Sequence, residues 1–300
     1  MRRTGHIGPH YSRSSRGYSI NPPPAPEIEV VMLGGYKEDG RSRTGPRSKI
    51  FQGFWDVYHG SFPKDESEPR RTWEGVVKNP HTIRSKDLYV EDHAMAALRR
   101  GRVVGMATGA FIDGDPADRS SILGPMLYGS YMAVRKGSRN SGVAYALYDA
   151  AKIFGKEMAQ RRGSDRVDWI VCETDDPRVS QNVAMDPNQR LIFLDNLGFM
   201  AVDPAKFEYK QPQLTQETEP CPGLFWCINT PDSRISSEKL LTALRRWVPG
   251  QFEALPGMEG EYGRYTRNPD KDPTFQYMER QLEGVHDLRL VDLKKFMVRK

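Results

Sequence analysis

The sequence predicts an α/β (α+β) protein, in which helices flank a central sheet of strands. Two observations lead to this prediction. Apolar segments of strand length alternate with segments of helical periodicity, and one of them, residues 127–134, runs through a turn of small residues directly into a helix. With 300 residues, 38% of them apolar, the chain can bury the core of one large domain or two small ones.

The first segment is not expected to join this core. Residues 1–26 contain four arginines, no acidic residue and a run of prolines, so we predict a basic, proline-rich disordered arm. An organellar transit peptide is the alternative, although the arm has no clear amphipathic helix. The apolar residues 27–33 then predict the first strand.

The next segment predicts a helix at residues 50–58, because its aromatic residues recur at helical spacing along one face. They are Phe51, Phe54, Trp55 and Tyr58. We interpret this stripe mainly as core, with a role in lining a ligand site as the alternative for its far end.

An acidic segment separates this helix from a short one expected at residues 72–77. We interpret Asp65, Glu66 and Glu68 as a solvated face, and the alternative is that they attract a cationic ligand. Extended segments follow at residues 88–98 and 102–112. The glycine of the sequence between them, Arg-Arg-Gly-Arg, predicts that they form a hairpin.

The turn after strand 127–134 has the composition of an anion-binding loop. Gly142 and Ala144 carry almost no side chain, so the amides between Arg139 and Ala144 can approach an anion closely. The dipole of the following helix and the charge of Arg139 favour the same ligand. An ordinary glycine-containing turn is the alternative interpretation.

The second half predicts a strand at residues 167–173 and a helix at residues 189–198. Gly198 suits a left-handed helix stop, and Phe199 is expected to fill the core after it. The final antiparallel pair is expected at residues 207–210 and 224–228. Beyond residue 231, helical periodicity at residues 236–248 and around residues 274–282 predicts a C-terminal helical extension.

Charge and composition exclude several functional classes. The net charge is +5 and the isoelectric point is near 9.0, but the basic residues form no recognisable nucleic-acid motif, so a polyanionic cofactor is the preferred explanation. No apolar run reaches the length of a membrane span, and no secretory signal is evident.

The cysteines and histidines indicate neither disulfides nor a metal site. Cys172, Cys221 and Cys227 form no Cys-x-x-Cys pair, and the six histidines are scattered. We therefore expect no metal and a reducing compartment, the cytoplasm. Cys172 is interpreted as a small buried residue, with a nucleophile as the alternative.

Two segments in this order resemble the signatures of the GNAT N-acetyltransferase superfamily. The first is Arg139-x-x-Gly142-x-Ala144 between a strand and a helix, and the second is the helix that closes with Leu-Gly-Phe at residues 197–199. The resemblance covers roughly residues 28–230. It implies a GNAT fold with a mixed, mostly antiparallel sheet that splays between its fourth and fifth strands. We accordingly expect the GNAT domain at residues 27–230 and the extension at residues 231–300.

The resemblance also implies a co-substrate, acetyl-CoA or another acyl-CoA, and the residues that bind it. These are Met132, Ala133, Val134, Arg139, Asn140, Ser141, Gly142, Val143 and Ala144. Backbone groups of Met132 and Val134 would pair with the pantetheine arm, and the amide of Val134 would donate to the oxyanion. The loop at residues 174–188 is longer than usual, which suggests a role in selecting the acceptor.

Two positions depart from the family pattern. Leu194 stands where many relatives place a tyrosine that protonates the leaving thiolate, and Tyr128 stands where some carry a glutamate base. A phenol is a weak base at neutral pH. Glu173, at the carboxyl end of an apolar strand, is the better candidate base because partial burial would raise its pKa. A plain strand end followed by a turn is the alternative.

The leading hypothesis is an N-acyltransferase, most simply an N-acetyltransferase, that transfers the acyl group to an amine by direct attack in a ternary complex. The expected acceptor is a small molecule, a protein lysine is the alternative, and homodimerisation stays open. The absent tyrosine motivates a second hypothesis, a catalytically silent acyl-CoA sensor or scaffold. A nucleic-acid binder is a third hypothesis, less favoured than the others.

Overall fold

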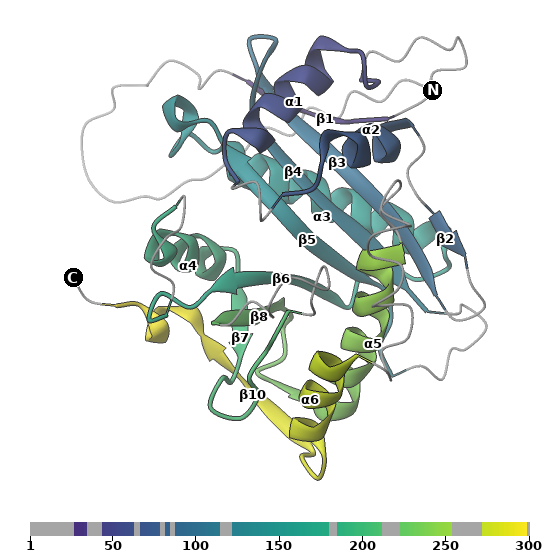
Figure 1. Ribbon diagram of the computed structural model, residues 1–300, viewed down its shortest axis with the longest axis vertical. Helices are drawn as coiled ribbons and strands as arrows, with labels where there is room; N and C mark the ends of the chain where they lie inside the picture. Colours follow the sequence, from purple (N-terminus) through teal and green to yellow (C-terminus); the bar gives the residue numbers. More distant parts are fainter. Residues whose placement is uncertain are drawn as a thin grey trace.

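The computed structural model describes residues 27–34, 44–62, 67–78, 82–84, 88–114, 122–179, 185–211, 223–253 and 272–298. The expected arm at residues 1–26, together with Asp65, Glu66 and Cys221, lies outside these ranges. Within them, ten strands form a single sheet, and the helices cover both of its faces (Figure 1).

The strands of the sheet lie in the order β1-β3-β4-β5-β6-β8-β7-β10-β9, and β2 also pairs with β3. Their bounds are β1 Ile28–Met32, β2 Thr82–Arg84, β3 Tyr89–Arg99, β4 Arg102–Asp113, β5 Met126–Val134, β6 Trp169–Asp175, β7 Phe199–Val202, β8 Leu224–Asn229, β9 Arg234–Ser236 and β10 Asp287–Asp292. Among these strands only β5 and β6 pair in parallel. The mixed, mostly antiparallel sheet of the GNAT expectation is therefore confirmed.

Within the described part of the chain, six α-helices pack on this sheet, and two short 3-10 helices follow β5 and β10. Their bounds are α1 Lys49–His59, α2 Arg70–Lys78, α3 Val143–Arg161, α4 Pro187–Asn196, α5 Ser237–Glu253, α6 Pro273–Leu282, η2 Lys136–Ser138 and η4 Leu293–Phe296. α1, α2, α5 and α6 cover one face of the sheet, and α3 and α4 cover the other. In Figure 1, α1 lies in front of the sheet and α3 behind it.

Local sequence signals start these helices where expected. The Ser48 side chain accepts a hydrogen bond from the amide of Phe51 at 3.0 Å, and Ser236 accepts one from the amide of Lys239 at 3.1 Å. The predicted aromatic stripe of α1 is largely buried. Gly198 has a φ of 87°, and Phe199 after it is buried, as predicted.

The hairpin between β3 and β4 turns through Arg100 and Gly101. Both residues have positive φ, 50° and 72°, as a two-residue type I′ turn requires. Arg99 and Arg102 are paired across this turn. The turn therefore brings a group of arginines to one end of the sheet.

The expected last strand pair is wrong in one of its members. Residues 207–210 are not a strand, because the amide of Phe207 donates to the carbonyl of Asp203 at 3.0 Å and the amide of Glu208 donates to the Gln281 side chain at 2.8 Å. β7 takes the place beside β8 instead, with Met200 opposite Ile228. The segment at 207–210 approaches β6, because the Tyr209 hydroxyl donates a hydrogen bond to Glu173 of that strand.

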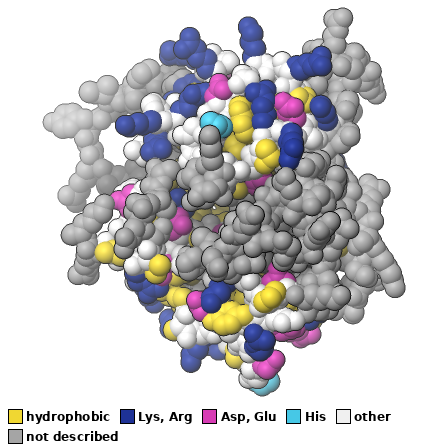
Figure 2. All heavy atoms as spheres, in the orientation of Figure 1, with side chains coloured by type: hydrophobic (Ala, Val, Ile, Leu, Met, Phe, Trp, Pro, Cys, Tyr) yellow, Lys and Arg dark blue, Asp and Glu magenta, His cyan; other side chains and the backbone are white. Residues whose placement is uncertain are grey.

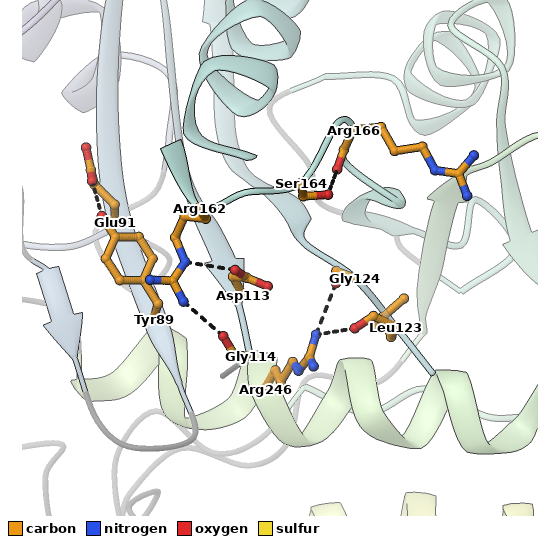
Figure 3. A network of polar contacts seen from close by, with 10 residues as sticks. All are labelled: Tyr89, Glu91, Asp113, Gly114, Leu123, Gly124, Arg162, Ser164, Arg166 and Arg246. Carbon is orange, nitrogen blue, oxygen red and sulfur yellow. Dashed lines mark hydrogen bonds and ion pairs between the residues drawn. The ribbon is translucent and has the colours of Figure 1, made fainter. Parts of the chain in front are cut away.

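The C-terminal extension contains the expected helices and two additional strands. β10 pairs with β7, so the extension continues the sheet. Arg246 of α5 donates to the carbonyls of Leu123 and Gly124 at 2.7 and 3.0 Å (Figure 3). Nearby, Arg162 at the end of α3 forms an ion pair with Asp113 at 2.8 Å. No described helix has both the length and the apolar character to span a membrane.

Candidate active site

The two parallel strands of the sheet pair over only part of their length. β5 and β6 are in register from Met126 opposite Trp169 to Gly129 opposite Cys172, and β5 then continues to Val134 while β6 continues to Asp175. Apart from the extra β2, these are the fourth and fifth strands of the sheet in chain order. The expected splay is thus present, and it begins beside Glu173.

A β-bulge in β5 lies where the two strands part. Gly109 of β4 is opposite Gly129 and Thr108 is opposite Tyr131, so Ser130 has no partner in the ladder. A Cβ atom at Gly109 would collide with the carbonyl oxygen of Tyr128. Only glycine fits there, and the bulge bends β5 away from the direction of β6.

Beyond the bulge, alternate backbone groups of β5 point away from β4. The amide of Arg135 donates to the carbonyl of Val104 at 2.9 Å, which makes these two residues a hydrogen-bonded pair. Because bonded and non-bonded pairs alternate in an antiparallel ladder, Ala133 also bonds to β4, whereas Met132 and Val134 direct their amides to the splayed side. Ala133 therefore has no backbone group free on that side.

The loop before α3 presents a series of backbone amides. Asn140 and Gly142 have φ values of 58° and 82°, and Gly142 caps α3 without a side-chain hydrogen bond. The first backbone hydrogen bond of the helix runs from the amide of Ala146 to the carbonyl of Gly142 at 3.0 Å. Within the described ranges, the amides from Ser141 to Ala144 have no acceptor. Such amides at a helix N-terminus are suited to an anion.

Basic side chains surround this loop. Arg99 of β3 donates to the carbonyl of Ser141 at 3.1 Å and to its hydroxyl at 2.8 Å, which ties the loop to the sheet. Several more are exposed on the hairpin and the loop: Arg100, Arg102, Arg135, Lys136 and Arg139. Figure 2 shows Lys and Arg gathered over the upper part of the molecule, the end that carries α1 and β1 in Figure 1. This charge supports a polyanionic ligand.

Glu173 has two tyrosine partners at the start of the splay. The hydroxyl of Tyr209 donates to its carboxylate at 2.6 Å and that of Tyr128 donates at 3.3 Å. Burial raises the pKa of Glu173 to about 7, although both hydrogen bonds act to lower it. A carboxyl group with this pKa can accept a proton near neutral pH.

Tyr128 is the weaker of the two candidate bases. Burial and the neighbouring charge of Glu173 raise the pKa of its phenol well above its usual value, so the hydroxyl stays protonated. It stacks on Trp226 with ring centres 6.4 Å apart. The arrangement suits a hydrogen-bond donor that orients Glu173.

Glu68 differs from the solvated face that the sequence suggested. Its carboxylate accepts hydrogen bonds from Tyr58 of α1 and, at 3.2 Å, from Tyr131 of β5. Burial raises the pKa of Glu68 above its usual range. Because its partner Tyr131 lies on the same face of β5 as Tyr128, the partner of Glu173, the two glutamates lie on the same face of the sheet.

Leu194, where the family resemblance would place a tyrosine acid, is apolar, but the hydroxyl of Tyr148 packs near it. Leu194 is half-buried in a cluster with Met132, Cys172 and Tyr148 of α3. The Tyr148 hydroxyl accepts a hydrogen bond from Asn229 at 3.0 Å, and within the described residues its own proton has no acceptor. It can therefore donate to a group in this cluster.

Sequence reasoning missed Tyr209, Tyr148 and Asp92 as site residues, and it gave Glu68 a secondary role. The tyrosines lie in segments interpreted as a strand or a helix, so no motif singled them out. Asp92 carried a signal, since it stands between Glu91 and His93 in an otherwise apolar strand, and successive side chains of a strand face opposite sides, so these neighbours cannot all lie on one exposed face. The long loop at residues 174–188 is described only in part.

The comparison with protein families agrees with this geometry. Residues 48–182 match the model described as Acetyltransferase (GNAT) family. This part of the chain belongs to the GNAT family. The match includes the strands that part, the anion-binding loop and both Glu68 and Glu173. The matched region ends at residue 182, so the domain boundary expected at residue 230 stays a prediction.

The comparison with solved structures found matches of low identity. A tandem GNAT protein from the clavulanic acid biosynthesis pathway is 18% identical, with a TM-score of 0.41 over 62% of this chain and 47% of that one, so the chain spans about half its length. The ribosomal-protein-S18-alanine N-acetyltransferase from Escherichia coli is 9% identical, with a TM-score of 0.37 over 68% and 96%. An aminoglycoside 6'-N-acetyltransferase complexed with coenzyme A is 15% identical, with a TM-score of 0.36 over 60% and 92%. A search of curated proteins found no match.

Proposed function

We propose that this chain is an acyl-CoA-dependent N-acyltransferase that uses acetyl-CoA to acylate an amine. The observation that carries this proposal is the parting of β5 from β6 beside Glu173, with an anion-binding loop at the end of the same strand. A thioester donor supplies the acyl group in such a reaction. The anion-binding loop would hold the thioester donor, and the opening between the strands would bring its acyl group to the acceptor amine beside Glu173.

The donor site is supported by the loop and by the end of β5. The amides from Ser141 to Ala144, with Arg139 beside them, would hold the phosphates. The backbone groups of Met132 and Val134 that β4 leaves free would pair with the amides of the pantetheine arm. This donor set fits a long polyanion that carries peptide-like groups.

The chemistry of transfer would use Glu173 and the backbone amide of Val134. Glu173 takes a proton from the acceptor ammonium, so that the amine nitrogen can form its bond to the acyl carbon. The amide of Val134 donates to the acyl oxygen as negative charge develops there. Both partners are held before reaction, which is consistent with direct attack in a ternary complex.

Tyr148 is our candidate for the acid that Leu194 does not provide. When the carbon–sulfur bond breaks, the thiolate needs a proton, and the Tyr148 hydroxyl has one to donate in the cluster that Met132 and Cys172 share. Burial and the nearby Cys172 raise the pKa of Tyr148, which keeps this proton in place at neutral pH.

The location is inferred from the thiols. Cys172 and Cys227 lie directly opposite each other on β6 and β8 and are both free, which supports a reducing compartment such as the cytoplasm. Fractionation of cells followed by immunoblotting tests this. Recovery from an oxidising compartment would contradict it.

The deciding experiment is thiol release from acetyl-CoA across a panel of amines, with calorimetric titration of CoA. Turnover that depends on Glu173 is expected, and Glu173→Gln should abolish it while CoA affinity is kept. Glu74→Gln, which changes a partly exposed glutamate of α2 paired with Arg70, is the matched control. Binding of CoA without turnover of any amine would favour the sensor hypothesis.

A further inference from the structure

Asp92 of β3 is a buried carboxyl group without a partner. It is 7% exposed, its Oδ2 atom has no hydrogen-bond partner, and no ion pair to it occurs within the described ranges. Burial, together with the charges of Glu68 and Glu91, raises its pKa well above the usual value. An unpaired carboxyl group is costly to bury, so it indicates a missing cation.

A second unpaired group lies next to Asp92 on the same face of the sheet. Asp92 is opposite Ala110, and Thr108, two residues before Ala110 on β4, points to the same side. Thr108 is 2% exposed, and its hydroxyl has no hydrogen-bond partner among the described residues. Two neighbouring polar groups are thus left unsatisfied.

Glu68 is linked to this position through Tyr131, which donates to it at 3.2 Å and is opposite Thr108 in the sheet. The tyrosine partners of Glu68 belong to a cluster of aromatic rings. The ring of Tyr131 is 5.2 Å from that of Tyr58 and 4.8 Å from that of Phe62, centre to centre, in edge-on arrangements. Trp73 packs on Tyr58 at 5.6 Å. A carboxylate among aromatic rings favours an organic cation, because ring faces attract positive charge.

Glu68 and Glu173 are each hydrogen-bonded to a tyrosine of β5. Tyr131 donates to Glu68, and Tyr128 donates to Glu173. Since Ser130 is the bulged residue, Tyr128 and Tyr131 are about two ladder positions apart, which corresponds to roughly 7 Å. A short diamine can span this separation.

We propose that Glu68 and Asp92, with the hydroxyl of Thr108, form a second ammonium-binding subsite that selects an acceptor with two amino groups. One amine lies beside Glu173 and reacts, and the other is bound by this subsite. The inference rests on the proposed function, because it assigns the acceptor class to the same site. It explains why a buried carboxyl group and a buried hydroxyl lie beside the half-buried Glu68 with no cationic side chain bonded to them among the described residues.

The test compares a diamine with a monoamine of equal length on the full chain. Calorimetry in the presence of saturating CoA measures the affinity of putrescine and of butylamine. Putrescine is expected to bind at least about tenfold more tightly, since a charge-assisted hydrogen bond contributes that much. Glu68→Gln and Asp92→Asn should each remove most of this preference without changing the affinity for CoA. Glu74→Gln should retain it.

Failure of the subsite and failure of the proposed acyltransferase activity would give different results. Equal affinity for the two amines, with thiol release from both, would overturn the subsite and leave the acyltransferase intact. A diamine preference that depends on Glu68 but comes with no thiol release would support the subsite and contradict the proposed function. Displacement of putrescine by magnesium ions would overturn the organic-cation assignment. Asp92→Asn removes the carboxyl group that would ionise beside a bound ammonium, with little change of shape, so it also tests the subsite if the Glu68 variant fails to fold.

Discussion

The hydroxyl of Tyr209 donates a hydrogen bond of 2.6 Å to the carboxylate of Glu173. Tyr209 comes from an irregular segment after β7, and Glu173 lies on β6 where the parallel pairing with β5 has just ended. The contact holds the carboxylate at the start of the splay. It also stabilises the charged form, in opposition to burial.

Removing this hydrogen bond should shift the pH dependence of activity. A base must be deprotonated to act, so kcat/KM should rise with pH through the pKa of Glu173, about 7. Tyr209→Phe removes a bond to the charged form, which raises this pKa and moves the rise to higher pH by about one unit. Rate profiles between pH 5 and pH 9 (roughly two units either side of the pKa) measure it.

The matched control is Tyr277→Phe. Tyr277 also donates its hydroxyl to a glutamate, Glu208, but at an exposed site. Its profile should equal that of the unmodified protein. An unchanged profile for Tyr209→Phe would show that Glu173 is not the base that limits kcat/KM.

The sequence was sufficient for the elements whose signals are local. Apolar periodicity located the six α-helices and the strands β1, β3, β4, β5, β6 and β8, but it did not predict β2, β7, β9 or β10. The glycine spacing located the loop before α3. Contacts between distant segments were not predictable in the same way. Glu68 meets Tyr131, which is 63 residues away, and Tyr209 meets Glu173 at a separation of 36 residues. These pairs depend on how α1 and the 207–210 segment pack on the sheet.

Tyr148 should contribute to the breaking of the carbon–sulfur bond. Tyr148→Phe keeps the ring that packs on Phe199 and removes only the hydroxyl. We expect kcat to fall about tenfold or more, with little change in the KM for acetyl-CoA, because proton donation matters in the transition state. Tyr145→Phe, one turn earlier on α3, is the control and should leave kcat unchanged. Equal kcat for the two variants would exclude Tyr148 as the acid.

The bulge in β5 should depend on Gly109. Gly109→Ala forces a Cβ atom into the carbonyl of Tyr128, so it should lower the free energy of unfolding by about 2 kcal/mol or more. Gly129 lies directly opposite, and a Cβ there would have only ordinary contacts, the nearest at 3.9 Å. Gly129→Ala should therefore cost less than about 1 kcal/mol. Urea denaturation of both variants tests the contrast, and equal midpoints would contradict it.

Gly142 should matter through its backbone conformation. A Cβ at this position would meet only Ile28, at 3.9 Å, but the φ of 82° is strained for a β-branched residue. Gly142→Val should therefore distort the loop and weaken CoA binding by tenfold or more (on the order of 1–2 kcal/mol of strain). Gly142→Asn should weaken it less, because asparagine tolerates this region. Calorimetric titration of CoA ranks the two, and full affinity in the valine variant would contradict the anion-binding assignment.

Glu173 should also make stability depend on pH. Its pKa is raised from 4.5 to about 7 in the folded protein, so the folded state holds a proton that the unfolded state releases between these values. The resulting stability is present below about pH 4.5 and is lost as the pH rises through 7. The loss amounts to about 3 kcal/mol at most, from 2.5 units at 1.36 kcal/mol each.

Glu173→Gln cannot release this proton, so the free energy of unfolding of the unmodified protein should fall relative to that of the variant as the pH rises from 4.5 to 7.5. Comparing the two proteins cancels the contributions of Glu68 and Asp92, whose pKa values are raised as well. Parallel pH curves for the two proteins would mean that Glu173 is already ionised in this range, and the carboxylate would then act through its charge rather than as a base that titrates near neutral pH.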